Sequence, residues 1–210
     1  MKEPGDIAFV VKVCGITNRD DAQVSVEAGA NALGFNFYPK SPRYLSPDAA
    51  YEIARGLPDG VLRVGVFVNT TPEEVARIAA RVPLDVMQLH GEIIPALPNR
   101  TWRAVFAGRD VPEGETTPEA YLLDSYTTAY GGSGKTFDWR LAAAYHGRLI
   151  LAGGLDGTNV GQAIATARPW GVDASSRLEL QPGKKDAERV RAFVSAALAA
   201  ARTVSGIGQE

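Results

Sequence analysis

The stretch FVVKVCGITNRDD, residues 9–21, places a lysine and the only cysteine of the chain in an otherwise apolar segment. Side chains alternate across a strand, so Lys12 and Cys14 would point the same way, with Cys14 at the end of the strand. An ammonium group beside a thiol lowers the pKa of the thiol, which would prepare Cys14 to act as a base. The alternative is a buried cysteine that packs as a small apolar residue, and such cysteines are common.

A carboxylate ends a second apolar segment, AYLLD, at Asp124. Burial without a neighbouring cation would raise the pKa of Asp124 and make it a proton donor near neutral pH. A helix cap or a loop anchor is the alternative role for such an aspartate. The segment YGGSGKTFDW that follows is rich in glycine but does not match the G-x-x-x-x-G-K-[ST] spacing of a P-loop.

Small residues at two later positions favour a phosphate site. Gly153 and Gly154 place no side chain between a ligand and the main chain, so their N–H groups would be accessible. Ser175 and Ser176 would open a short helix, whose N-terminus attracts an anion. Together these residues predict a phosphorylated small molecule as the ligand.

Besides Lys12, which we also assign to substrate contact, four other polar residues are candidates for substrate binding. Arg43, in PKSPRY, would bind a carboxylate through two hydrogen bonds, although a solvent-facing arginine is the commoner case. Gln88 and His90 would donate hydrogen bonds into a pocket, with a loop-anchoring role as the alternative for His90. Asp173 follows another apolar segment, and we assign it to substrate contact as well. With two histidines and one cysteine in the chain, no metal-site spacing is present.

These candidates follow short apolar, β-branched segments that recur along the chain. We expect strands at 9–14, 31–36, 62–68, 85–89, 102–107, 121–124, 148–152 and 170–174. Most are followed by a helical pattern, as in TPEEVARIAARV, where Val75, Ile78 and Val82 recur at helical spacing. The segment KDAERVRAFVSAALAAA repeats this pattern, and we expect it to close the domain.

Continuously apolar strands that alternate with helices predict a parallel sheet buried on both faces. Eight such units in 210 residues fit a single (β/α)₈ TIM barrel over residues 1–210. An open doubly wound sheet is the alternative, but no G-x-G-x-x-G turn follows the first strand. The intervals 90–101 and 108–120 leave helices 4 and 5 short or missing. In such a barrel the reacting groups lie at the carboxyl ends of the strands, which is where the candidates fall.

Composition and charge disfavour several classes of partner. The chain has 22 basic and 24 acidic residues, mixed along its length, so no single-sign field attracts nucleic acid or a membrane surface. One cysteine forms no internal disulfide, no signal-peptide pattern is present, and no apolar run approaches about 20 residues. We therefore expect a cytoplasmic protein, monomeric or homodimeric, that acts on a small molecule.

Taken together, the motifs resemble the phosphoribosylanthranilate isomerase family, (β/α)₈-barrel enzymes of tryptophan biosynthesis. The matching stretches, in the order of the family, are KVCGITNRDDA, GANALGFNFYPKSPRYLSP, VGVFVN, VMQLHGE, LLDS, YGGSGKTFDW, AGGL, VDASS and PGKKD. The resemblance implies the Amadori rearrangement of N-(5'-phosphoribosyl)anthranilate, without a cofactor. It also implies that Cys14 is the general base, Asp124 the general acid and Arg43 the ligand of the anthranilate carboxylate, with the glycine and serine loops binding phosphate.

The chain departs from the family pattern SSGVE at Arg177 and Leu178, so the eighth loop is expected to differ in shape. Two other functions remain as alternatives. An indole-glycerol-phosphate synthase would use the same phosphate loops with a lysine-centred site. A non-catalytic phosphosugar-binding module would keep these loops and Arg43 but would not need both proton-transfer groups.

Overall fold

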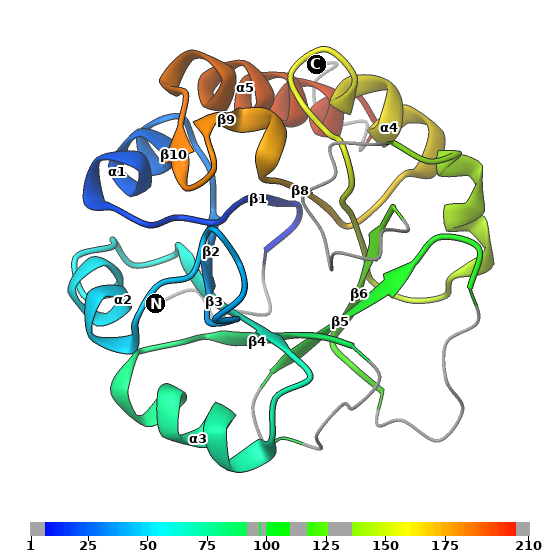
Figure 1. The fold of residues 1–210 in the computed structure, drawn as a ribbon. Coiled ribbons are helices and arrows are strands. Elements are labelled where there is room, and N and C mark those ends of the chain that lie inside the picture. The colour runs from blue at the N-terminus through cyan, green and yellow to red at the C-terminus, as the bar shows by residue number, and fades with distance from the viewer. Residues whose placement is uncertain (1–6, 92–96, 98–99, 110–116, 126–135, 205–210) are drawn as a thin grey trace.

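The computed structural model describes residues 7–91, 97, 100–109, 117–125 and 136–204. Its core is a closed barrel of eight parallel strands in chain order, with the last strand paired to the first (Figure 1). The strands are β1 Val10–Cys14, β2 Ala32–Asn36, β3 Leu62–Val68, β4 Val86–His90, β5 Thr101–Phe106, β6 Ala120–Asp124, β7 Leu149–Leu151 and β8 Gly171–Ala174. The predicted barrel is therefore confirmed, and no predicted strand end is displaced by more than one residue.

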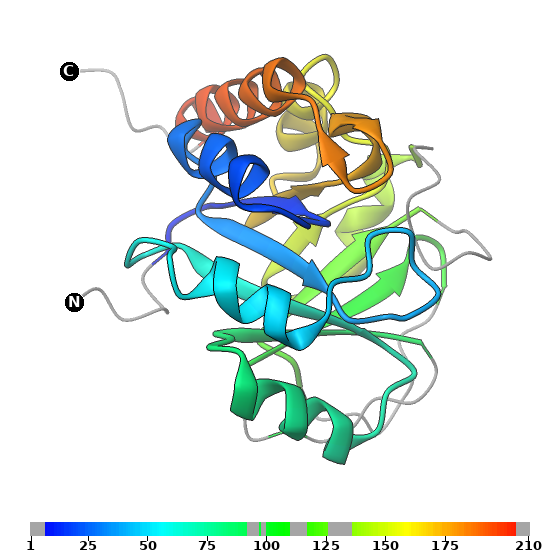
Figure 2. The same ribbon diagram turned by 60° about the vertical axis from the view of Figure 1, so that its left-hand side comes forward.

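Helices surround the barrel (Figures 1 and 2). They are α1 Arg19–Glu27, α2 Pro47–Ala54, α3 Pro72–Arg81, α4 Val160–Ala167 and α5 Ala187–Val204. The start of α3 follows from its sequence, because the Thr71 side chain accepts a hydrogen bond from the Glu74 N–H and Pro72 suits the first turn. In the described part of the chain, no helix combines the length and the apolar character needed to cross a membrane.

Two predicted gaps in the ring of helices fall largely outside the described residues. Between β4 and β5 the structure does not describe residues 92–96 and 98–99, and between β5 and β6 it does not describe 110–116. The described residues of both intervals form no helix, and the prediction about helices 4 and 5 otherwise falls outside the described part of the chain. The connection from β6 to β7 carries the 3₁₀ helix η2, Trp139–Ala144, after an undescribed stretch at 126–135.

Strand side chains alternate between two cores, and this alternation sets the position of the candidate base. Val11 packs outward against the helices, whereas Val10 belongs to the apolar core inside the barrel. Lys12 and Cys14 also face inward, against β2, where a Cβ at Gly34 would lie 2.7 Å from the Cys14 Sγ and 3.2 Å from the Lys12 Cε. Because Gly34 has no side chain, both residues fit against the neighbouring strand.

A small antiparallel hairpin was not predicted. It consists of β9, Glu179–Gln181, and β10, Lys184–Lys185, and follows the 3₁₀ helix η3, Ser176–Leu178. Its turn contains Pro182 and then Gly183 at φ +81°, an order typical of a type II turn, and this was the available sequence signal. The hairpin lies beside α1 and the start of α5 (Figures 1 and 2).

Candidate active site

A cavity of about 390 Å³ lies at the carboxyl ends of the barrel strands. The sequence-predicted residues that line it are Cys14, Arg43, Gln88, His90, Asp124, Asp173 and Ser175. Further lining residues, which the sequence did not single out, include Asn36 and Leu122. The barrel thus brings the candidate acid, the candidate base and the candidate carboxylate ligand to one cavity, although they come from separate strands and loops.

The predicted phosphate loops form a second, smaller cavity of about 50 Å³. Its lining includes Gly153, Gly154, Ser175 and Ser176. Asp124, Asp173 and Ser175 line both cavities, so the two share a wall. The expected short helix after β8 is a single 3₁₀ turn, since η3 has only three residues.

Asp124, at the end of β6, has the protonation behaviour predicted for a general acid. Burial raises its pKa to about 6, and the nearby Asp173 carboxylate adds to this effect. The Ser125 N–H donates a hydrogen bond of 2.7 Å to Asp124 Oδ1 and partly opposes the shift. Asp124 therefore keeps its proton to a higher pH than an exposed aspartate does.

Lys12 lies beneath the cavity rather than in its lining. It is fully buried, and its Nζ is 2.8 Å from Asp173 Oδ1 on the adjacent strand β8. Although burial, the largest influence, lowers the pKa of Lys12, Asp173 and Cys14 together raise it above its ordinary value. Lys12 is thus a buried cation outside the cavity lining, and its assignment to substrate contact stays a prediction.

The expected lowering of the Cys14 pKa is wrong in this structure. Burial raises the pKa of the thiol, and Asp173 raises it further, while Lys12 offsets only part of the shift. The physical reason is that burial is the largest influence on the thiol, while the Lys12 charge also serves Asp173. Lys12 still favours the thiolate, but it does not overcome the burial of the sulfur.

Gln88 and His90 lie at the end of β4 and contact each other. The Gln88 Nε2 is 2.7 Å from the His90 Nε2, so a neutral ring accepts a hydrogen bond from the amide. Burial lowers the pKa of His90 to about 3, and the cations of Lys12 and Arg103 contribute to the shift. His90 is thus neutral at physiological pH. No cluster of three or more His, Cys, Asp or Glu side chains suited to a metal ion occurs among the residues that the structure describes.

Arg43 does not face solvent, since its side chain is only 13% exposed. It forms a two-point ion pair with Glu179, in which Nε donates to Oε1 at 2.8 Å and Nη2 donates to Oε2 at 2.7 Å. The Arg43 stem crosses Gly15, where a Cβ would lie 2.6 Å from the Arg43 Cδ. Sequence reasoning assigned no role to Glu179 or to Lys185, the buried lysine beside it.

The departure from the family pattern at the eighth loop has a structural outcome. Arg177 forms an ion pair with Asp156, which lies in the loop after β7. Leu178 is fully buried in the core between the barrel and the helices. Arg177 and Leu178 therefore connect the predicted phosphate loops after β7 and β8 to each other and to the core.

The chain is similar in sequence and structure to several known isomerases. The family model "PRAI: N-(5'phosphoribosyl)anthranilate (PRA) isomerase" matches residues 11–196. The N-(5'-phosphoribosyl)anthranilate isomerase of Solibacter usitatus is 50% identical over 202 residues, which cover 91% of this chain and 98% of that protein. The crystal structure of phosphoribosyl anthranilate isomerase from Thermotoga maritima aligns with a TM-score of 0.81 at 44% identity, covering 91% of this chain and 99% of that one. A phosphoribosyl anthranilate isomerase in complex with reduced 1-(o-carboxyphenylamino)-1-deoxyribulose 5-phosphate aligns with a TM-score of 0.77 at 39% identity and the same coverage.

Proposed function

The chain belongs to the N-(5'-phosphoribosyl)anthranilate isomerase family, and we propose that Cys14 and Asp124 carry out the proton transfers of its reaction. The enzyme converts N-(5'-phosphoribosyl)anthranilate to 1-(2-carboxyphenylamino)-1-deoxyribulose 5-phosphate, an Amadori rearrangement in tryptophan biosynthesis. One observation supports these roles: the Cys14 thiol and the Asp124 carboxyl group line the same cavity, and burial raises the pKa of both groups.

The first proton transfer is assigned to Asp124. Its protonated carboxyl group donates a proton to the ring oxygen of the ribose, and the C1'–O bond breaks as the nitrogen lone pair forms an iminium ion. The raised pKa of Asp124 suits this step, because a general acid must hold its proton near the working pH.

The second proton transfer is assigned to Cys14. The thiolate removes the proton from C2', whose acidity the adjacent iminium ion has raised, and the electron pair moves onto the nitrogen. The resulting enolamine takes a proton at C1' as its C2' hydroxyl becomes the ketone. Because the substrate nitrogen accepts the electron pair, we propose that the reaction needs no cofactor.

Two anchors are proposed to hold the substrate across the cavity. The loops that carry Gly153, Gly154, Ser175 and Ser176 bind the phosphate through backbone N–H groups and hydroxyls. Arg43 binds the anthranilate carboxylate at the other end, with Gln88, His90 and Asp173 along the cavity between them. Fixing both ends of the substrate makes each proton transfer effectively intramolecular.

The two alternative functions have less support. A lysine-centred synthase would need a lysine at the centre of the catalytic cavity. Lys12 is fully buried in an ion pair with Asp173, outside the cavity lining, and Lys40, the lysine among the lining residues, is an exposed residue of the loop after β2. A non-catalytic module would not require Cys14 and Asp124 to share a cavity. Membership of the isomerase family favours the same conclusion.

The proposed roles are tested by Cys14→Ala and Asp124→Asn. We expect each substitution to lower kcat by roughly 10²- to 10⁴-fold, the usual contribution of a positioned acid or base. Loss of phosphoribosylanthranilate fluorescence measures turnover, and calorimetry with the reduced product measures binding, which we expect to persist. Asp138→Asn, which removes an exposed carboxylate paired with Arg140, is the control. Full turnover in either active-site variant would remove the assigned role.

We also infer that the enzyme works in the cytoplasm as a monomer or a homodimer. The support for the location is that Cys14, the proposed base, is a free thiol and must stay reduced, as thiols do in the cytosol. Cell fractionation tests the location, and sedimentation of the purified protein tests the assembly. Enrichment in an oxidising compartment, or a larger oligomer, would contradict the inference.

A further inference from the structure

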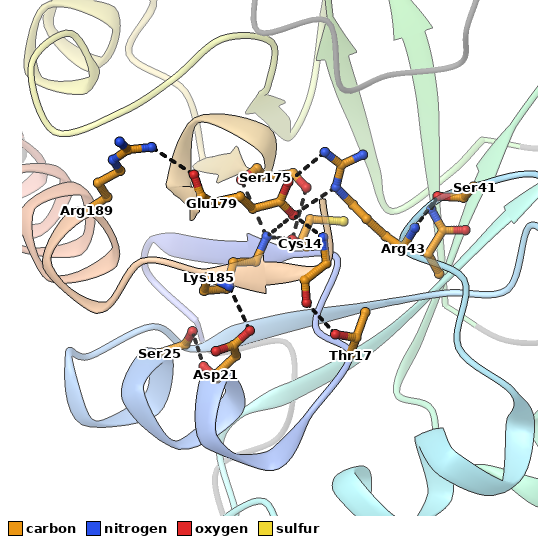
Figure 3. Close-up of polar contacts among 12 residues, drawn as sticks. Cys14, Thr17, Asp21, Ser25, Ser41, Arg43, Ser175, Glu179, Lys185 and Arg189 are labelled. Atoms are coloured by element: carbon orange, nitrogen blue, oxygen red, sulfur yellow. Dashed lines mark hydrogen bonds and ion pairs between the residues drawn. The ribbon is translucent and has the colours of Figure 1, made fainter. Parts of the chain in front are cut away.

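The guanidinium of Arg43 has two hydrogen-bonding edges, and Glu179 occupies one of them. Nε and Nη2 donate to the two carboxylate oxygens of Glu179 at 2.8 and 2.7 Å (Figure 3). The remaining edge, which carries Nη1, makes no hydrogen bond within the described part of the chain. Because Arg43 lines the cavity, this second edge is the one available to a ligand carboxylate.

Glu179 is a buried anion, since its side chain is only 3% exposed. Burial by itself raises the pKa of Glu179, but the hydrogen bonds from Arg43 and the charge of Lys185 bring it below its ordinary value. The carboxylate therefore remains charged throughout the physiological pH range. A charged and immobile acceptor fixes the plane of the guanidinium more firmly than solvent does.

Lys185 joins this ion pair to the candidate base. Its Nζ is 2.9 Å from Glu179 Oε1 and donates a hydrogen bond of 2.6 Å to the carbonyl oxygen of Cys14. The Lys185 side chain is 1% exposed, so it makes these contacts away from water. One buried ammonium group thus fixes the backbone of Cys14 and the carboxylate that orients Arg43 (Figure 3).

The β9–β10 hairpin places these charges opposite each other. Lys185 and Glu179 are cross-strand partners in its register. The hairpin is attached to the segment after β1, because the Thr17 hydroxyl donates to the Gly183 carbonyl and the Lys185 N–H donates to Asp21 Oδ2 at 2.8 Å. The position of Arg43 is therefore tied to the same strand that carries Cys14.

We propose that Glu179, supported by Lys185, is a positioning residue that presents one edge of Arg43 to the carboxylate of the substrate. The inference rests on the proposed role of Arg43 and extends it to the residues that orient the guanidinium. With two cations and one anion, the cluster of Arg43, Glu179 and Lys185 carries one net positive charge, which matches a single ligand carboxylate.

The opposite interpretation is that Glu179 competes with the substrate for Arg43. Competition and positioning predict opposite signs, because removing a competitor tightens binding of a carboxylate whereas removing a positioning group weakens it. Two probes separate these cases: the reduced product, 1-(2-carboxyphenylamino)-1-deoxyribulose 5-phosphate reduced at its ketone, and the same compound without the carboxyl group.

The experiment measures the Kd of both probes by calorimetry for the unmodified enzyme, Arg43→Ala and Glu179→Gln. We expect Glu179→Gln to weaken binding of the carboxylated probe by about tenfold or more, the usual effect of a charge-assisted hydrogen bond. Binding of the decarboxylated probe should change by less than about twofold, because its contacts do not involve Arg43. KM should rise with the Kd of the carboxylated probe, while kcat changes less.

Glu119→Gln is the matched control. Glu119 also accepts two hydrogen bonds from one arginine, Arg100, but it precedes β6 at the opposite end of the barrel. We expect Glu119→Gln to leave both Kd values unchanged. Should Glu179→Gln fail to fold, the double variant Glu179→Gln/Lys185→Met keeps the net charge of the cluster and is expected to lose affinity for the carboxylated probe in the same way.

The outcomes separate the inference from the function on which it rests. Equal weakening of both probes, no weakening, or tighter binding of the carboxylated probe by Glu179→Gln would overturn the positioning role. If Arg43→Ala itself failed to distinguish the two probes, the carboxylate-binding role of Arg43 would be wrong, whatever Glu179 does. If Arg43→Ala weakened binding of the carboxylated probe alone and Glu179→Gln did not, the role of Arg43 would stand. Only the positioning role of Glu179 would then be rejected.

Discussion

At the scale of single residues, the proposed acid and base have their pKa values in an unusual order. Asp124 must be protonated to act as an acid, yet its pKa is about 6, whereas the pKa of the Cys14 thiol lies above its ordinary value. Burial causes both shifts. Between the two pKa values, the fraction of enzyme with a protonated Asp124 and a Cys14 thiolate is small and nearly constant with pH.

This order predicts the pH dependence of kcat/KM. Below about pH 6 Asp124 is protonated, so activity should fall with the thiolate fraction as pH decreases. Above about pH 6, the fraction of Cys14 thiolate rises with pH while the fraction of protonated Asp124 falls. The two changes cancel, and kcat/KM reaches a plateau. In Asp124→Asn the cancellation disappears, and the residual activity should keep rising with pH. A plateau retained in that variant would contradict the assignment.

The raised pKa of Asp124 also predicts a cost to stability. Its folded-state pKa of about 6 exceeds the ordinary value of 3.8, so the stability that comes from its bound proton is present at low pH and is lost as pH rises through 6. Asp124→Asn should therefore increase the free energy of unfolding at pH 7, by up to about 3 kcal/mol. Urea denaturation at pH 7 and at pH 4 tests the sign, and the gain should be largely absent at the lower pH.

At the scale of secondary-structure elements, the contact between β1 and β2 positions Cys14, the proposed base. The two strands pair in parallel, with Cys14 beside Gly34. A side chain at position 34 would meet both the Sγ and, at 3.1 Å, the Cα of Cys14, so a change of rotamer alone would not make room. The apolar pattern of β2 predicted this strand, but it did not show why a glycine occurs in it.

Gly34→Ala is therefore expected to displace Cys14. We expect kcat to fall by roughly 10²-fold, since a small misplacement of a reacting group has an effect of this size. Overpacking should also lower the free energy of unfolding by about 1–3 kcal/mol. Gly161→Ala in α4 is the control, because nothing lies within 4 Å of the added Cβ. Normal kcat in Gly34→Ala would show that the β1–β2 contact does not position the thiol.

At the scale of the whole molecule, the barrel closes where β1 pairs with β8. The ion pair between Lys12 and Asp173 crosses this closing contact inside the barrel. Asp173 of this pair also lines the candidate cavity, so closure of the barrel and assembly of the site share this residue. We propose that residues 1–210 unfold as one cooperative unit for this reason.

Removal of one partner tests the closing contact. Asp173→Asn leaves the Lys12 ammonium buried without its counterion, and we expect the free energy of unfolding to fall by about 3–5 kcal/mol. Lys12→Met/Asp173→Asn removes both charges and should recover part of this loss. Calorimetry measures both effects and should show a single transition for each protein. A double variant no more stable than Asp173→Asn, or two transitions, would contradict this account.

The sequence by itself determined the eight strands, the barrel and the positions of most site residues. These are local properties, because apolar segments and alternating side chains show which residues end a strand, and the order of parallel strands places those ends at one face. The PGKK turn shows that even the β9–β10 hairpin had a local signal. The family motifs are likewise short stretches of sequence that can be recognised without the tertiary structure.

Only the tertiary structure decided which charges meet. Arg43 and Glu179 are 136 residues apart, and Lys185 is 171 residues from the Cys14 carbonyl that it binds. Such pairs leave no trace in strand periodicity, since any buried charge requires a partner but the local pattern does not say which one. The raised pKa of Cys14 has the same origin: it depends on Asp173 and on burial, both of which arise only when the barrel closes.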